Sequence, residues 1–100
     1  MDIAIDRSAS GTTLSPTGPL DGTSAAALQE LLLAAIAENP PALFLDFAQV
    51  PYVSSAGLRV LVVTTKELKP RGQRLRLINV PDAVLQVLKM ANFTSFLDVG

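Results

Sequence analysis

The side chains best placed to do chemistry are those of two adjacent serines, Ser54 and Ser55. Apolar residues at helical spacing follow them, including Leu58, Leu61 and Leu68, so a helix is expected to begin within or just after the pair. A helix N-terminus carries unpaired N–H groups and the positive end of the helix dipole. A serine at that place can either cap the helix or carry a covalent anion such as phosphate.

The local pattern leaves both interpretations open. In the structural one, Ser54 or Ser55 is the helix N-cap and Gly57 is a small residue that allows close packing. In the functional one, a serine accepts a phosphate, which adds roughly −1.5 to −2 charges and is tolerated by the helix dipole. A partner surface suited to a neutral serine would repel that charge. The spacing alone does not decide between the two.

The elements that must position these serines alternate between strands and helices. The apolar stretch 42–47 predicts a buried strand, and the linker 48–53 leads from it to the serine pair. Pro16 and Pro19 lack the N–H that a sheet ladder needs, so their segment is expected to be an edge or irregular. In chain order, we expect strands over 3–9 and 12–15, a helix from Thr23 or Ser24 to Asn39, a strand over 42–47, a helix from the serine pair to Pro70, a strand over 75–78, a helix from Pro81 to Asn92 and a short strand over 96–99.

This order of elements predicts an α/β fold. We expect a mixed, largely parallel sheet of four to five strands with an N-terminal edge hairpin, joined by right-handed crossovers through three to four helices. The 100 residues are enough for one hydrophobic core and too few for two. Residues 1–100 are therefore expected to form a single domain.

The composition excludes several classes of functional site. The chain has neither histidine nor cysteine, which removes histidine-based triads, histidine metal sites and thiol chemistry. It also lacks the glycine motifs that cradle phosphates. We therefore expect a protein that is not an enzyme and that binds no metal or cofactor. The absence of cysteine, of a signal peptide and of a membrane-spanning run predicts a cytoplasmic protein without direct membrane insertion.

The charge argues against nucleic acid as a partner. The net charge is −1, with eight basic and nine acidic residues, whereas binding to phosphate backbones needs a concentrated basic surface. The one basic cluster surrounds the end of the central helix and is more simply explained as a solvated group that the helix dipole favours. Its members are Lys66, Lys69, Arg71, Arg74 and Arg76.

The outer face of the central helix is a candidate interaction surface. At about 100° per residue, the pattern places one set of side chains inward: Leu58, Leu61, Val62, Thr65 and Leu68. It places a second set outward: Arg59, Val60, Val63 and Glu67. Scattered surface valines are common, but two of them beside the serine turn also suit a protein-binding face.

Two aspartates are further candidate residues. Asp46 ends the strand that leads to the serine turn, and Asp21 lies within an early turn, Gly18–Gly22. Each could cap a turn or a helix N-terminus, or could contact a partner. No spacing or companion base makes them a catalytic carboxylate pair.

The sequence resembles the STAS family, the anti-sigma factor antagonists or anti-anti-sigma factors. The resemblance rests on SSAGLRVL over 54–61, which is preceded by Leu45-Asp46-Phe47 and by VPYV over 50–53. Two further stretches extend it over nearly the whole chain: GPLDG over 18–22 and VLKMANF over 87–93. In the family, a strand ending in Asp is followed by Asp-Ser-Ser/Thr-Gly-Leu-Gly at a helix start. Aligning the glycine places the family's phosphorylated serine on Ser55. Three positions depart from the pattern: Ser54 replaces the Asp, Ala56 a Ser or Thr, and Arg59 a Gly.

The resemblance implies a bacterial signal-transduction protein that regulates transcription by partner switching. The unphosphorylated protein would bind an anti-sigma factor serine kinase of the GHKL type and thereby free a sigma factor or other target. Phosphorylation of Ser55 would break the complex, and a PP2C-like serine phosphatase would restore it. Asp21 resembles the family's early Asp, which implies a position at the same end of the sheet as the serine turn. The loop around the phosphoserine would comprise Ser54, Ala56, Gly57 and Leu58, and the partner contacts would comprise Asp21, Asp46, Arg59, Val60 and Val63.

A second function is compatible with the same resemblance. Some STAS domains are constitutive subunits, for example beside the ATPase of a lipid-transport complex, and have no phosphorylation cycle. The loss of the family's Asp at position 54 favours this alternative.

Overall fold

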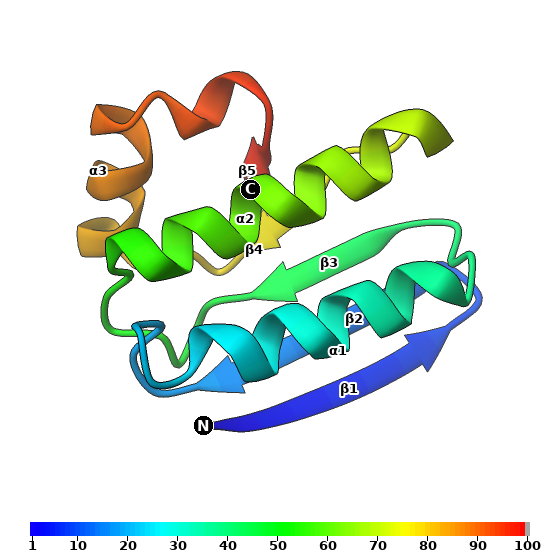
Figure 1. Ribbon diagram of the computed structural model, residues 1–100, viewed down its shortest axis with the longest axis horizontal. Coiled ribbons are helices and arrows are strands. Elements are labelled where there is room, and N and C mark those ends of the chain that lie inside the picture. The colour runs from blue at the N-terminus through cyan, green and yellow to red at the C-terminus, as the bar shows by residue number, and fades with distance from the viewer. Residues whose placement is uncertain (100) are drawn as a thin grey trace.

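The computed structural model describes residues 1–99 and contains the predicted alternation of strands and helices (Figure 1). The early hairpin, the central helix that follows the serine pair and the short final strand are all present. The elements are β1 (Asp2–Ser8), β2 (Gly11–Thr17), α1 (Ala25–Ala37), β3 (Leu43–Asp46), α2 (Ser55–Leu68), the 3-10 turn η1 (Lys69–Arg71), β4 (Arg76–Ile78), α3 (Asp82–Met90), the 3-10 turn η2 (Phe93–Ser95) and β5 (Asp98–Val99).

The five strands form one mixed sheet in the order β1-β2-β3-β4-β5. The hairpin pairs antiparallel from Asp2 with Thr17 to Ser8 with Gly11, and the pairs from β2 to β5 are parallel. Each crossover after β2 therefore moves one strand further in the same direction. Right-handed crossovers then place successive helices on the same face, and Figure 1 shows α1 and α2 side by side across one face of the sheet.

Successive side chains along each strand point alternately to that covered face and to the opposite one. Leu14, Leu45 and Leu77 are fully buried beneath the helices. Their neighbours Phe44 and Arg76 point the other way, where the guanidinium of Arg76 lies over the ring of Phe44 at 5.6 Å from the centroid. The hydrophobic core thus lies between the helices and one face of the sheet.

Pro16 does not lie at an edge, so of the two predicted alternatives only the irregular one applies. It belongs to β2, the second strand of the sheet, and pairs with Ile3 of β1. On the other side, the N–H groups of Thr12 and Gly18 donate to β3 and its extension, so the nitrogen of Pro16 faces the same neighbour. The β2–β3 ladder ends at Leu14, two residues before this position. The expected irregularity is therefore an interrupted ladder on one side of an internal strand.

Helix α2 begins at Ser55, as the sequence predicts, but its buried face differs from the predicted one. The prediction that Val60 lies outward is wrong, because its side chain is only 2% exposed. The helical-wheel argument followed large apolar residues, whereas the small residues Gly57 and Thr64 also pack inward. Helix α1 also contacts α2, and this contact buries more of the circumference of α2. The buried residues of α2 are Gly57, Val60, Leu61, Thr64 and Leu68.

Within residues 1–99, no helix combines the length and the apolar character that a bilayer span requires.

Candidate functional site

The serine turn is held in place by two neighbouring loops. The loop between β3 and α2 runs beside the loop that follows β2, and backbone hydrogen bonds join them like an extension of the sheet. Gly18 N–H donates to Gln49 O at 2.9 Å, Leu20 N–H donates to Tyr52 O at 3.1 Å, and Ser54 N–H donates to Leu20 O at 2.9 Å. The turn is therefore tied to the neighbouring loop up to and including Ser54.

Gly57 allows the first turn of α2 to approach these loops closely. A Cβ atom at this position would lie 2.7 Å from Leu20 Cγ, 2.7 Å from Val53 Cγ1 and 2.8 Å from the Leu20 carbonyl oxygen. These separations are shorter than any non-bonded carbon contact can be. The close-packing role predicted for Gly57 is confirmed, and it anchors the helix start to the same loop that bonds Ser54.

The two serines occupy different environments. Ser54 is at the N-cap position, with an extended backbone at φ −86° and ψ 178°, but its hydroxyl makes no capping hydrogen bond to α2. Its Oγ is buried and has no hydrogen-bond partner within residues 1–99. Ser55 is the first residue of α2 and is exposed. The Ser54 hydroxyl thus does not cap the helix as the structural interpretation expects. Ser55 is the serine of the pair that an enzyme could reach.

Asp21 lies beside the serine turn, as the family resemblance implies. Its carboxylate accepts hydrogen bonds from Thr23 N–H at 2.9 Å, from Thr23 Oγ1 at 2.6 Å and from the Tyr52 hydroxyl at 3.3 Å. The bond from the Thr23 hydroxyl, followed by that from its backbone N–H, lowers the pKa of the Asp21 carboxyl. Asp21 is therefore ionised at neutral pH, and its negative charge lies against Tyr52, which precedes the start of α2 by three residues.

Tyr52 is a candidate site residue that the sequence argument missed. Its side chain is 50% exposed, and its hydroxyl is oriented by Asp21. Its aromatic ring stands in the loop just before the serines. An aromatic residue in a turn next to a candidate phosphoacceptor was the signal that could have identified it, since exposed tyrosines are enriched where proteins bind each other.

Asp46 has a local structural role in the observed geometry. It is half-buried at the end of β3, and its Oδ1 accepts the N–H of Ala48 at 2.9 Å. This bond closes the turn that leaves the strand, which is one of the two roles left open by the sequence. A partner contact by Asp46 stays a prediction.

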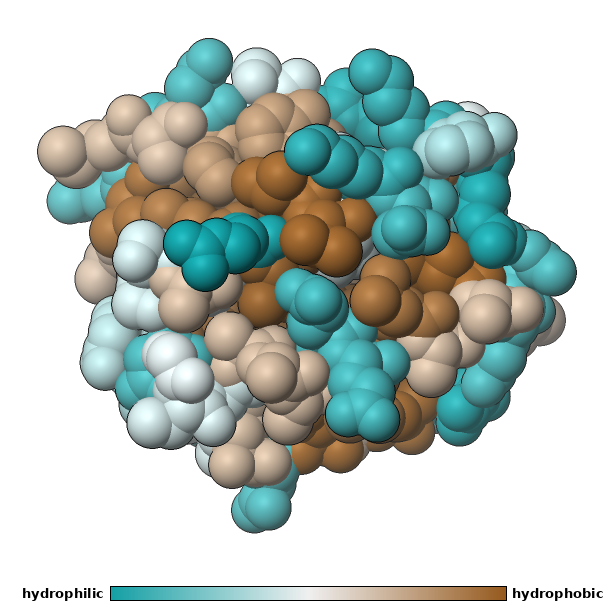
Figure 2. Space-filling view, in the orientation of Figure 1, coloured by the Kyte–Doolittle hydropathy of each residue, from teal (hydrophilic) through white to brown (hydrophobic). Residues whose placement is uncertain are grey.

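The outward side of α2 carries a row of three side chains. Ser55, Arg59 and Val63 are spaced four residues apart and so lie along one line of the helix surface. Arg59 is exposed and Val63 is half-buried, whereas Val60 belongs to the core. Ala56 and Leu58 are half-buried against the core. Figure 2 shows apolar side chains over α2 and towards α3, with hydrophilic side chains among them.

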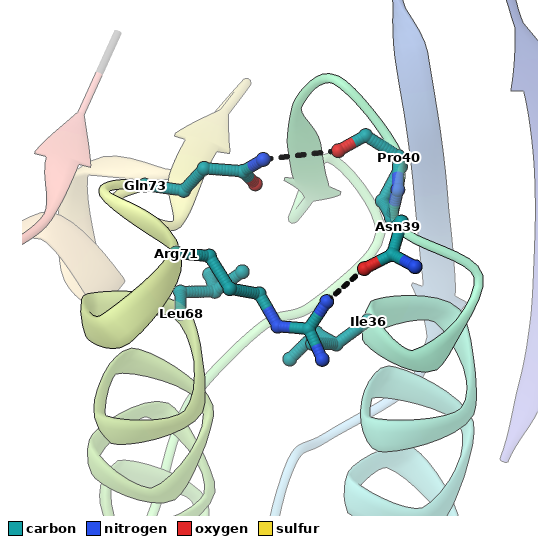
Figure 3. Close-up of a pocket in the computed structure, with 6 residues that line it drawn as sticks. All are labelled: Ile36, Asn39, Pro40, Leu68, Arg71 and Gln73. Atoms are coloured by element: carbon teal, nitrogen blue, oxygen red, sulfur yellow. Dashed lines mark hydrogen bonds between the residues drawn. The ribbon is translucent and has the colours of Figure 1, made fainter.

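The opposite end of α1 and α2 is closed by polar contacts (Figure 3). A hollow of about 240 Å³ lies there, and in it Arg71 donates to the side chain of Asn39 while Gln73 Nε2 donates to Pro40 O at 3.0 Å. The guanidinium therefore sits where the carbonyl ends of both helices favour a cation. Residues 1–99 contain no group of three acidic side chains that could hold a metal ion. The serine turn remains the best candidate site.

Comparisons with known proteins identify the family. Residues 2–99 match the family described as STAS domain. The anti-sigma-F factor antagonist RsfB of Mycobacterium tuberculosis is 38% identical over 55 residues, a match that spans 55% of this chain and 45% of RsfB. The alignment therefore spans about half the length of that curated relative.

Solved structures share the fold. The structure of an anti-sigma factor antagonist from Mycobacterium paratuberculosis superposes with a TM-score of 0.88 at 21% identity, covering 98% of this chain and 83% of that one. The Bacillus cell-fate determinant SpoIIAA, solved in its phosphorylated form, superposes with a TM-score of 0.74 at 14% identity, covering 99% and 91%. With the family match extending over nearly all described residues, this chain belongs to the STAS domain family.

Proposed function

We propose that this chain is an anti-sigma factor antagonist whose binding is switched at Ser55. In the unphosphorylated state it binds an anti-sigma factor that is also a serine kinase of the GHKL type, and so releases a sigma factor or another regulated target. The observation that carries this proposal is the contrast between the two serines: Ser55 is exposed at the start of α2, while Ser54 is buried at its Oγ. The similarity to RsfB, named as an anti-sigma-F factor antagonist, supports the same function.

The docking face would surround the phosphoacceptor. Asp21 and Tyr52 flank the helix start on one side, and Arg59 and Val63 continue from Ser55 along α2 on the other. Asp46, at the same end of the sheet, would support the loop. Val60 is not part of this face, because it is buried in the core.

The switch would operate through charge. The kinase would transfer the γ-phosphoryl group of ATP to Ser55 Oγ, with loss of the hydroxyl proton and release of ADP. The product adds roughly −1.5 to −2 charges at a helix N-terminus that can tolerate them. Asp21 is already ionised nearby, so the docking face would become strongly negative. A partner surface that fits the neutral serine would have to desolvate this charge on binding, and the complex would dissociate.

The test begins with the intact mass of the protein isolated from its own cells, with fragmentation to locate any phosphate. We expect a fraction with one phosphoryl group on Ser55 that a PP2C-like phosphatase removes. In binding assays with the co-purifying kinase, Ser55→Asp should lose the complex and Ser55→Ala should retain it, while Ser54→Ala should behave as the wild type. Equal binding by the two Ser55 variants would refute a charge switch.

The same isolation tests the alternative function. Protein that is uniformly unmodified and recovered with a transport ATPase would identify a constitutive subunit. The sequence feature that favours this outcome is the serine at position 54, which stands where the family has Asp.

A further inference from the structure

A second hollow lies on the far flank of α2, away from the serine turn. It has a volume of about 460 Å³, which falls within the range of roughly 300–1,000 Å³ typical of small-molecule sites. Lys66, one of the residues that line it, follows Ser55 by eleven residues. This separation is roughly 16 Å along the helix axis, at 1.5 Å per residue. The residues that line it are Val62, Thr65, Lys66, Lys69, Gln73, Arg74, Ser95 and Phe96.

The floor of this groove is apolar and rigidly supported. Val62 projects from α2 and Phe96 from the segment after η2, and both are half-buried. The ring of Phe96 packs against that of Phe93 with centroids 5.0 Å apart. Arg74 donates to the Ser95 carbonyl at 3.2 Å and ties this wall to the start of β4. The wall of the groove that carries Phe96 is therefore held by a ring contact and a hydrogen bond within the fold.

The rim of the groove is cationic. Three of its lining residues are basic and none is acidic. Arg74 is already paired with Asp98 at 3.2 Å, whereas the salt bridges found within residues 1–99 include neither Lys66 nor Lys69. Two exposed ammonium groups thus flank an apolar floor without a carboxylate partner in this part of the chain.

We propose that this groove binds a small amphiphilic anion, a medium-chain carboxylate with its tail on Val62 and Phe96 and its head between Lys66 and Lys69. A neutral amphiphile would leave the two ammonium groups without a counter-charge, and a cationic one would be repelled. An amphipathic helix from a partner needs a row of apolar pockets at i, i+3, i+4 and i+7, which two apolar side chains do not supply. The proposal is independent of any chemistry at Ser55.

The test is a titration of the full chain with decanoate below its critical micelle concentration, followed by NMR amide shifts. We expect saturable binding with shifts concentrated at Val62, Thr65, Ser95 and Phe96. Decanol should bind more weakly than decanoate, and decyltrimethylammonium should not bind. Raising the salt concentration should weaken the binding of decanoate but not that of decanol.

Variants separate the head and tail contacts. The double variant Lys66→Gln/Lys69→Gln should weaken decanoate binding roughly tenfold, the combined effect of two exposed ion pairs, and leave decanol binding unchanged. Val62→Thr keeps the side-chain shape and should weaken both ligands. Lys89→Gln, on α3 and outside the groove, is the matched control and should change neither. Because the lysines also favour the C-terminal end of α2, the melting temperature of each variant is measured without ligand.

Several results would overturn the proposal. These are the absence of saturable decanoate binding, equal binding of the cationic amphiphile, shifts centred elsewhere, or a double variant that binds decanoate as the wild type does. Binding of an acidic peptide in place of decanoate would assign the surface to a protein partner and would equally overturn it.

Discussion

The burial of Val60 and the half-burial of Val63 make a sharp prediction about two valines on one helix. Replacing Val60 by Ala removes two methyl-sized groups from a side chain that is 2% exposed. At about 0.8 kcal/mol for each buried methylene, with a further contribution from the cavity, the loss is about 2–3 kcal/mol. Alanine returns about 0.5 kcal/mol through its higher helix propensity. The free energy of unfolding should therefore fall by about 1.5–2.5 kcal/mol.

Val63→Ala is the matched control, because it makes the same chemical change in the same helix with the same gain in propensity. Val63 is half-buried and leaves no enclosed cavity, so its free energy of unfolding should change by less than about 0.5 kcal/mol. For a domain of this size, 1 kcal/mol corresponds to about 4–8 °C in the midpoint of thermal unfolding. Val60→Ala should thus unfold about 6–20 °C below the wild type, and Val63→Ala close to it.

The assay is thermal and urea unfolding followed by circular dichroism, with both variants purified in parallel. The slope of the urea transition should stay constant, which would show that the change lies in the folded state. Equal destabilisation by the two variants, or a larger effect at Val63, would refute the inferred orientation of α2 and with it the outward row of Ser55, Arg59 and Val63.

Three further outcomes follow from the site. Gly57→Ala should lower the free energy of unfolding by about 1–2 kcal/mol in urea unfolding, because the clash with the Leu20 carbonyl outweighs the gain in helix propensity; a stabilised variant would contradict the close approach. The folded state lowers the pKa of Asp21, so the stability of the wild type relative to Asp21→Asn should be present above about pH 4 and lost as the pH falls through the folded pKa; unfolding at several pH values checks this, and a constant difference would contradict it. In protein phosphorylated on Ser55, Arg59 lies four residues along the same face, so Arg59→Ala should cost about 0.5 kcal/mol more in the phosphorylated form than in the unmodified form; calorimetry of both forms measures it, and an equal cost would rule out the pairing.

The order of the elements could be predicted because each one carries its own local signal. These signals are the apolar run 42–47, the prolines that end helices and the helical spacing after the serines, and all of them depend only on neighbours in sequence. The corresponding strands and helices appear where they were expected. The position of Asp21 near the turn was also within reach. In a parallel arrangement, the chain reverses at the same end of the sheet after β2 and after β3, so residues in both loops meet there.

The errors concern what only the assembled fold decides. Which side of α2 is buried depends on its contact with α1 as well as on the sheet. The sequence pattern of residues 55–68 does not indicate that α1 packs against this helix. The missing N–H of Pro16 predicted an edge or an irregular segment and left the choice between them open. Pro16 lies in an internal strand, and the ladder on that side ends before reaching it and so tolerates the residue. The residue type and position of Tyr52 made it a possible candidate, but that its side chain is exposed and bonded to Asp21 depends on the loop geometry.

The environments of the two serines also bear on the missing family Asp at position 54. The Ser54 Oγ is buried without a partner among residues 1–99, so a carboxylate in that orientation would lose its hydration and would need N–H groups of the first turn of α2 to compensate. A serine avoids this cost, because an unpaired hydroxyl is cheaper to bury than an unpaired charge. The same burial keeps the Ser54 hydroxyl away from a kinase, since the turn would have to rearrange before its Oγ could be reached. Ser55, one residue later and exposed, needs no such rearrangement. Under the proposed function, the serine at position 54 would therefore change the surroundings of Ser55, which stays the exposed serine of the pair.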